Sequence, residues 1–97
     1  MALTELIAAK TAAETSSAVT LSGPTTFVAD DLSIVDGVSE EVAIHRERVD
    51  GTFEALVIDR IAVVLTAHRP VITIEFYGDV KAVKGVTSDT VAVGYGS

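Results

Sequence analysis

Hydrophobic and polar residues alternate with a period of two along most of the chain after residue 16. A β-strand turns successive side chains to opposite faces of a sheet, so this pattern predicts strands with one buried and one exposed face. Residues 40–46 and 71–77 show it most clearly. The side chains of these two stretches that are expected to point into the core are Val42, Ile44, Ile72, Ile74 and Phe76.

Turn-forming residues divide this part of the chain into short segments, at intervals typical of a β-sandwich or a small barrel. The turn signals are Gly23-Pro24, Asp36-Gly37, Asp50-Gly51, His68 to Pro70, Gly78-Asp79 and Thr87 to Asp89. Residues 61–66 are almost continuously apolar, which predicts a strand covered on both faces. The whole pattern predicts a mainly β fold, an antiparallel sandwich or small barrel of seven or eight strands.

The first residues follow a different spacing. Leu3, Leu6, Ile7 and Lys10 recur at intervals of three and four among alanines, which predicts a short helix over residues 3–15. We therefore expect residues 1–16 to form an N-terminal helix or arm and residues 17–97 to form the β-domain. The stripe of Leu3, Leu6 and Ile7 would dock either on that domain or on another subunit, so these three are interface candidates.

Composition limits the classes of function. The chain has 97 residues, enough for one domain, and 48% of them are hydrophobic, mostly Ala and Val. The absence of cysteine excludes disulfides, thiolate metal sites and cysteine nucleophiles. Fourteen acidic residues against seven basic ones give a net charge of -7, which opposes binding to nucleic acid.

Neither a membrane span nor a secretory signal is expected. Asp59, Arg60 and Arg69 interrupt the most apolar third of the chain, well short of the roughly 18 to 20 apolar residues that a span needs. Glu5 stands early, where a signal peptide would carry a cationic region followed by an apolar run. The expected location is the cytoplasm, or the compartment of a larger assembly.

No motif indicates catalysis or cofactor binding. The sequence lacks a G-x-S-x-G segment and a glycine-rich phosphate loop. His45 and His68 are 23 residues apart, with no further ligand at metal-binding spacing, and are interpreted as a strand residue and a turn residue. We therefore predict a non-enzymatic protein without catalytic, cofactor-binding or metal-binding residues.

Clustered carboxylates are interpreted as solvated surface groups. Asp30, Asp31 and Asp36, followed by Glu40 and Glu41, offer oxygen ligands but lack the spacing of an EF-hand loop. Turn positions favour aspartate for backbone reasons alone. Three more acids are scattered along the chain: Glu54, Asp59 and Glu75. A glycosidase uses a pair of carboxylates, but positions on solvated strand faces explain these three residues equally well.

A cluster of mixed charge stands before the mid-chain turn. Arg46, Glu47 and Arg48 precede Asp50, a pattern typical of an exposed, salt-bridged hairpin end. Arginine is also enriched where proteins meet. Arg46 and Arg48 are therefore further interface candidates.

From about residue 20 onward the chain resembles a group of small, immunoglobulin-like β-sandwich proteins of tailed-bacteriophage virions, which serve as capsid decoration or fibre components. Residues 22–30 (SGPTTFVAD), residues 80–93 (VKAVKGVTSDTVAV) and the Asp50-Gly51 turn carry the resemblance. A tryptophan of the family pattern is missing after this turn, where Phe53 is the nearest aromatic residue.

The resemblance implies a structural protein of the virion, assembled in the host cytoplasm. Its partners would be its own copies, as a homo-oligomer, and a viral capsid or tail protein, with neither nucleic acid nor a membrane among them. The alternative is a carbohydrate- or protein-binding β-sandwich module that would use Tyr77, Tyr95 and the acidic loop 30–36.

Overall fold

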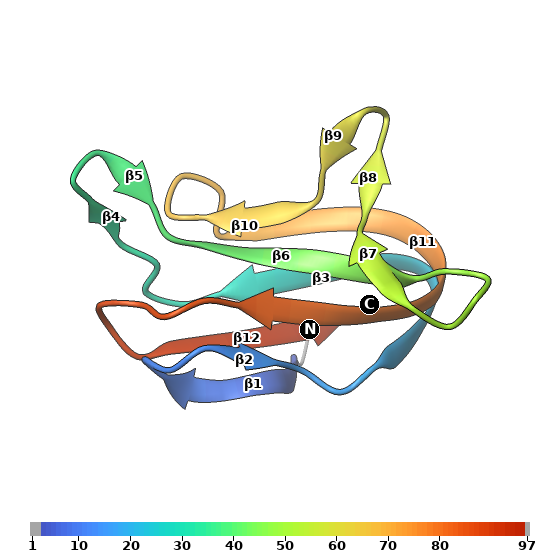
Figure 1. Ribbon diagram of the computed structural model, residues 1–97, viewed down its shortest axis with the longest axis horizontal. Helices are drawn as coiled ribbons and strands as arrows, with labels where there is room; N and C mark the ends of the chain where they lie inside the picture. The colour runs from blue at the N-terminus through green and yellow to red at the C-terminus, as the bar shows by residue number, and fades with distance from the viewer. Residues whose placement is uncertain (1–2, 97) are drawn as a thin grey trace.

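The computed structural model describes residues 3–96, and every strand pair in it is antiparallel (Figure 1). The mainly β, antiparallel fold is therefore confirmed. The strands are β1 (Thr4–Lys10), β2 (Glu14–Thr15), β3 (Val19–Ala29), β4 (Ile34–Val35), β5 (Val38–Ser39), β6 (Glu41–Glu47), β7 (Phe53–Ala55), β8 (Val57–Ile58), β9 (Ile61–Ala62), β10 (Val64–Thr66), β11 (Val71–Lys84) and β12 (Val91–Gly96).

Eight of these strands form one sheet in the order β1-β12-β3-β11-β6-β10, with β2 beside β11 and β7 beside β6. The two longest strands, β3 and β11, pair along ten positions and make the centre of the sheet. The second half of β11 also pairs with β6, and β10 at the end of the sheet comes back into contact with β3. The sheet therefore curls around its own core. Two small hairpins, β4–β5 and β8–β9, stand apart from it.

Glycines let the two central strands bend instead of ending. Gly23 in β3 has a φ of 144°, and Gly78 in β11 has a φ of 138°, values that only glycine adopts readily. Both strands curve visibly at one end of the molecule (Figure 1). The predicted breaks at Gly23-Pro24 and at Gly78-Asp79 are therefore wrong. Pro24 is tolerated because β12, as far as it is described, pairs with β3 only from Thr26 onward.

The core lies on the inner face of the curled sheet. Its alternation follows the sequence pattern: Val42 and Ile44 are fully buried, Ile72 is 6% exposed, and Ile74 and Phe76 pack against the core with partial burial. These expectations are confirmed. The buried apolar side chains are Ile7, Leu21, Phe27, Ala29, Val42, Ile44, Leu56, Val63, Leu65, Ile72, Val80, Ala82, Val91 and Val93.

The predicted N-terminal helix is wrong. Residues 4–10 form strand β1, which pairs with β12 and places Ile7 opposite Val93, with the Ile7 side chain fully buried. Helix propensity over so short a stretch is a weak preference that packing overrides. The pairing is irregular, with register shifts between Glu5 and Ile7 and between Ile7 and Lys10.

The prediction that one strand over residues 61–66 is covered on both faces is also wrong. Ile61 and Ala62 belong to the β8–β9 hairpin and are exposed, whereas Val64–Thr66 forms β10 at the end of the sheet. Only Val63 and Leu65 are buried in this stretch. A continuous apolar run does not distinguish a covered strand from a hairpin that exposes hydrophobic side chains.

Candidate interaction surfaces

Large hydrophobic side chains are exposed mainly on three hairpins rather than on the main sheet faces. These hairpins are β4–β5, β6–β7 and β8–β9. Exposed apolar groups cost free energy in water and mark sites of interaction when they gather in a patch. The exposed large hydrophobic residues are Leu3, Ile34, Val35, Val38, Val49, Val57, Ile61, Val71, Tyr77 and Val86.

The first surface, the β4–β5 patch, consists of Ile34, Val35, Val38 and Val86. Val38 is 70% exposed and Val86 is 77% exposed, and together with Val35 they line one shallow groove. The hairpin turns at Asp36-Gly37, where both residues have positive φ, as a two-residue type I′ turn requires. The short turn holds the two strands, and with them the three hairpin side chains, in a fixed relation.

Glu40 joins the two halves of this patch. Its Oε1 accepts a hydrogen bond of 2.9 Å from the backbone N–H of Ser33, at the foot of the hairpin. Its Oε2 accepts from the backbone N–H of Ser88 at 2.7 Å and from the Ser88 hydroxyl at 3.0 Å. The backbone hydrogen bonds from Ser33 and Ser88 lower the pKa of Glu40. Glu40 therefore fixes the loop that carries Val86 against the hairpin.

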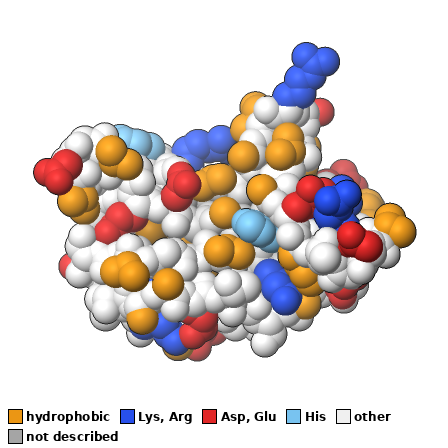
Figure 2. All heavy atoms as spheres, in the orientation of Figure 1, with side chains coloured by type: hydrophobic (Ala, Val, Ile, Leu, Met, Phe, Trp, Pro, Cys, Tyr) orange, Lys and Arg blue, Asp and Glu red, His pale blue; other side chains and the backbone are white. Residues whose placement is uncertain are grey.

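The rim of the β4–β5 patch is acidic. Residues 30–41 contain five carboxylates and no lysine or arginine. Asp31, Asp36 and Glu41 are exposed among them. Figure 2 shows hydrophobic side chains next to acidic ones over this end of the molecule. The surface therefore combines an apolar centre with negative charge, a combination that favours an apolar, cationic partner.

The second surface is the β8–β9 hairpin, which projects from the body (Figure 1). Asp59 and Arg60 form its turn, with φ of 52° and 67°. A left-handed backbone is uncommon for residues other than glycine, asparagine and aspartate. The hairpin has two residues in each strand and pairs with no other strand of residues 3–96, yet it exposes Val57 and Ile61. Figure 2 shows hydrophobic side chains along the projection and a basic one at its tip.

A groove runs between this hairpin and the first part of β11. Its walls are mostly aliphatic, and among them are Ile58, Ile61 and Ile72. Asp59 and Arg69 supply its charged lining, and Arg60 is adjacent in the turn. Over residues 3–96, neither arginine makes an ion pair within 4.0 Å. We call the hairpin and this groove together the β8–β9 surface.

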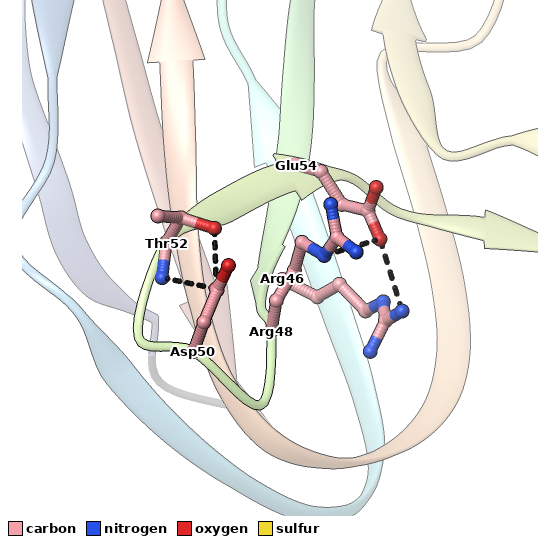
Figure 3. A network of polar contacts seen from close by, with 5 residues as sticks. All are labelled: Arg46, Arg48, Asp50, Thr52 and Glu54. Carbon is pink, nitrogen blue, oxygen red and sulfur yellow. Dashed lines mark hydrogen bonds and ion pairs between the residues drawn. The ribbon is translucent and has the colours of Figure 1, made fainter.

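The third surface is the end of the β6–β7 hairpin (Figure 3). Arg46 Nη2 lies 3.0 Å from Glu54 Oε1, and Arg48 Nε lies 3.7 Å from the same oxygen. The two predicted interface candidates are therefore held by a shared carboxylate of their own chain, with about half of each side chain exposed. Sequence reasoning placed the arginines at a salt-bridged hairpin end but did not identify Glu54 as their partner.

Asp50 stabilises the turn of this hairpin. Its Oδ1 accepts a hydrogen bond of 2.6 Å from the Thr52 hydroxyl and one of 3.0 Å from the Thr52 N–H. These bonds, the hydroxyl first, lower the pKa of Asp50. Val49 beside it is fully exposed. The hairpin predicted at Asp50-Gly51 is confirmed, since β6 and β7 pair across it.

The N-terminal interface candidates do not share one surface. Ile7 is fully buried and belongs to the core, and Leu6 packs against the core with partial burial. Leu3 is 46% exposed. Of the predicted stripe, the structure therefore leaves Leu3 as the residue most accessible to a partner.

Comparisons with family models, curated proteins and solved structures find no match for this chain.

Candidate groups for catalysis or metal binding lie apart. His45 is a half-buried residue of β6, and His68 is exposed in the turn between β10 and β11. In the part of the chain that the structure describes, no three His, Asp or Glu side chains form a group that could hold a metal ion. No helix within residues 3–96 is long and apolar enough to cross a membrane.

The candidate contacts of a binding module are also separated. Tyr77 is exposed opposite Ser22 of β3, whereas Asp30 follows the other end of that strand, roughly 25 Å away at about 3.3 Å per residue. Tyr95 is partly buried and stacks on Phe27, with ring centroids 6.3 Å apart. The acidic loop and the two tyrosines therefore do not form one site.

Lys84 is a buried charged residue, a feature that often marks a functional site, and it was not identified from the sequence. Its side chain is 2% exposed, and its Nζ donates hydrogen bonds to the carbonyl oxygens of Ala12 at 2.8 Å and Gly85 at 3.0 Å. Burial lowers the pKa of Lys84. Because its acceptors are backbone carbonyls of connecting segments, the contact is structural. No local pattern around residue 84 signals it.

Proposed function

We propose that this chain is a non-enzymatic structural protein of a tailed-bacteriophage virion, which decorates or cements the capsid or serves as an accessory component of the head or tail. It acts through protein–protein contacts with its own copies and with a capsid or tail protein. Its place is the virion, which is assembled in the host cytoplasm. In this proposal its curled sheet is an immunoglobulin-like β-sandwich.

The observation that carries the proposal is the display of apolar side chains on hairpins outside the main sheet. Val38 and Ile61 are more than half exposed on strands of two residues each, where they add nothing to the core. A chain that only had to fold would gain from polar residues at such positions. The cost of exposing them is accounted for if partners cover them in the assembly.

The resemblance to virion proteins also supports the proposal, because two of the segments that carry it contribute to the main sheet. Of the three parts that carry it, residues 22–30 and 80–93 contribute residues to β3, β11 and β12, which are direct neighbours in the order β12-β3-β11. The resemblance therefore involves the centre of the sheet, which forms the shared body of such domains. The β4–β5 and β8–β9 hairpins lie outside residues 22–30 and 80–93, whereas Val86 and the Asp50-Gly51 turn belong to the parts that carry the resemblance.

Immunogold electron microscopy tests the proposal. Antibodies raised against the purified chain should label virions of the phage whose genome encodes it, at a regular position on each particle. Mass spectrometry of the same purified virions should find the chain in many copies per particle. Particles that contain no trace of the chain, in a host that expresses it, would contradict the proposal.

A binding module is the second candidate, and Tyr77 favours it. This side chain is 68% exposed on the outer face of β11, and its hydroxyl donates to Glu75 Oε2 at 3.1 Å. Exposed aromatic rings stack on sugars and on peptide groups. Binding on a glycan array that Tyr77→Ala abolishes would support this function. Binding that depends on calcium and disappears in Asp30→Ala would place the site in the acidic loop instead.

A further inference from the structure

The β4–β5 patch has the chemistry of a surface that is covered in an assembly. Val35, Val38 and Val86 lie around one groove, and Glu40 holds the groove in shape through Ser33 and Ser88. A patch that is fixed before binding loses little conformational entropy when a partner covers it. Asp36 lies in the turn of the hairpin, and Glu41 lines the surface next to Val38 and Val86, so the partner must offer apolar groups together with positive charge.

A symmetric pair of two such patches does not meet this requirement. In a twofold contact each patch faces its own copy, so Asp36 and Glu41 of one copy would face the same acids of the other. Like charges brought together across an interface repel one another and oppose association. The acidic rim therefore disfavours pairing of the patch with itself.

The β8–β9 surface meets the requirement on the same chain. It exposes Val57 and Ile61, its groove is aliphatic, and Arg60 and Arg69 are free of ion pairs across residues 3–96. One acid, Asp59, lines it. In a chain of net charge -7, two unpaired arginines beside an apolar groove form the local complement of the acidic patch.

We propose that the β4–β5 patch of one copy docks on the β8–β9 surface of a second copy. Val38 and its neighbours would enter the aliphatic groove, and the acids of the rim would face Arg60 and Arg69. This inference rests on the proposed function and deepens it, because it names the surfaces through which copies of the chain contact one another.

The contact is heterologous, since two different surfaces of each copy take part. A docked pair keeps one free patch on one copy and one free groove on the other, so the assembly grows until the rotation between copies closes a ring, or continues as a filament. This property separates the proposal from any twofold dimer and makes it testable by mixing variants.

The experiment uses three full-length variants that each add one glutamate at an exposed valine or isoleucine. Val38→Glu places a carboxylate where the groove is apolar, and Ile61→Glu places one opposite the acidic patch. Val49→Glu is the control, because Val49 is fully exposed on the β6–β7 turn, outside both surfaces. Circular dichroism checks that all three keep the β-sheet spectrum, and sedimentation velocity at rising protein concentration measures association.

The wild-type chain and Val49→Glu should associate with the same dissociation constant, and higher salt should weaken both. Val38→Glu and Ile61→Glu should each raise that constant at least about tenfold, which is about 1.4 kcal/mol. An equimolar mixture of these two variants should form dimers and nothing larger, because an intact patch meets an intact groove only once.

Three results would overturn the inference. The first is a wild-type chain that stays monomeric up to its solubility limit, and the second is equal weakening by Val49→Glu. The third is association in wild type that the mixture of Val38→Glu and Ile61→Glu does not restore. Because virion labelling is measured separately, a chain found in particles that never associates with itself would refute this contact and leave the virion role standing through contacts with a capsid or tail protein.

Discussion

The Nζ of Lys84 donates a hydrogen bond of 2.8 Å to the carbonyl oxygen of Ala12, although the two residues are 72 positions apart in the chain. Through this bond the end of β11 holds the connection between β1 and β2. A buried cation of this kind is stable only while its donors are satisfied.

Lys84→Met should destabilise the protein by about 1 to 3 kcal/mol, because the carbonyl oxygens of Ala12 and Gly85 lose their donor in a buried place. Urea unfolding followed by circular dichroism measures the change. Lys81→Met is the control: Lys81 lies over the Phe53 ring with its Nζ 4.2 Å from the centroid, and its loss should cost less than about 1 kcal/mol. Equal effects of both changes would contradict a special role for Lys84.

Alkaline pH should stabilise the wild-type protein through Lys84. Burial lowers the pKa of this group in the folded state below its ordinary value of 10.5. Between the two values the unfolded chain binds more protons than the folded one, so the free energy of unfolding rises with pH. Below the folded pKa both states hold the proton, so Lys84 causes no further change of stability with pH. The rise should be missing in Lys84→Met when both proteins are unfolded in urea at a series of alkaline pH values.

Ile7→Ala should cost about 2 to 5 kcal/mol, as expected for a fully buried aliphatic side chain. Leu3→Ala should change stability by only about 0.5 kcal/mol, since Leu3 is almost half exposed. Thermal and urea unfolding of both variants give the comparison. A small effect at Ile7 would show that β1 is a detachable arm instead of a strand of the core.

Gly78→Ala should destabilise by about 1 to 3 kcal/mol, because alanine would have to adopt a strained backbone. Its Cβ would also lie 3.3 Å from the Phe76 ring. Gly85→Ala serves as the control, because a Cβ there meets no atom within 4 Å. If both variants unfold at the same urea concentration as wild type, the bend in β11 does not depend on glycine.

Acid should weaken the hydrogen bonds by which Glu40 connects Ser33 to Ser88. The lowered pKa of this carboxylate means that its contribution to stability is present above its ordinary value of 4.5 and is lost as the pH falls through the lower folded value. Glu40→Gln should remove this part of the acid dependence, because the amide cannot accept from both Ser33 and Ser88. Thermal unfolding between neutral and acidic pH tests it, with Glu41→Gln as the exposed control. If the unfolding temperature of Glu40→Gln falls with pH in the same way as that of wild type, Glu40 does not stabilise the protein through these hydrogen bonds.

Sequence predicted those parts of the fold that depend on neighbouring residues. Alternation identified Val42, Ile44 and Ile72 as core residues, because period two relates each side chain directly to a face of the sheet. The Asp50-Gly51 turn was found for a similar local reason. The spacing of Leu3, Leu6 and Ile7 predicted a helix, and this prediction is wrong because the pairing with β12 determines the conformation of these residues.

What sequence could not predict depends on residues far apart in the chain. Glycine signals a turn and a strand bend equally, and only the pairing of β3 with β11 shows which one occurs at Gly78. Glu40 and Lys84 each find partners more than forty positions away. The exposed patches could not be predicted for the same reason. A run such as residues 57–64 does not show which of its apolar side chains the sheet will cover.

The irregular pairing of β1 affects how copies of the protein can associate when their concentration is high. A strand at the margin of a sheet invites a neighbouring molecule to continue the hydrogen-bonded ladder, the route by which β-proteins convert to fibrils. The two register shifts in β1 interrupt the even spacing of backbone groups that such growth needs. Crowded copies are thereby directed away from amyloid-like stacking, and their mutual contacts are left to side chains.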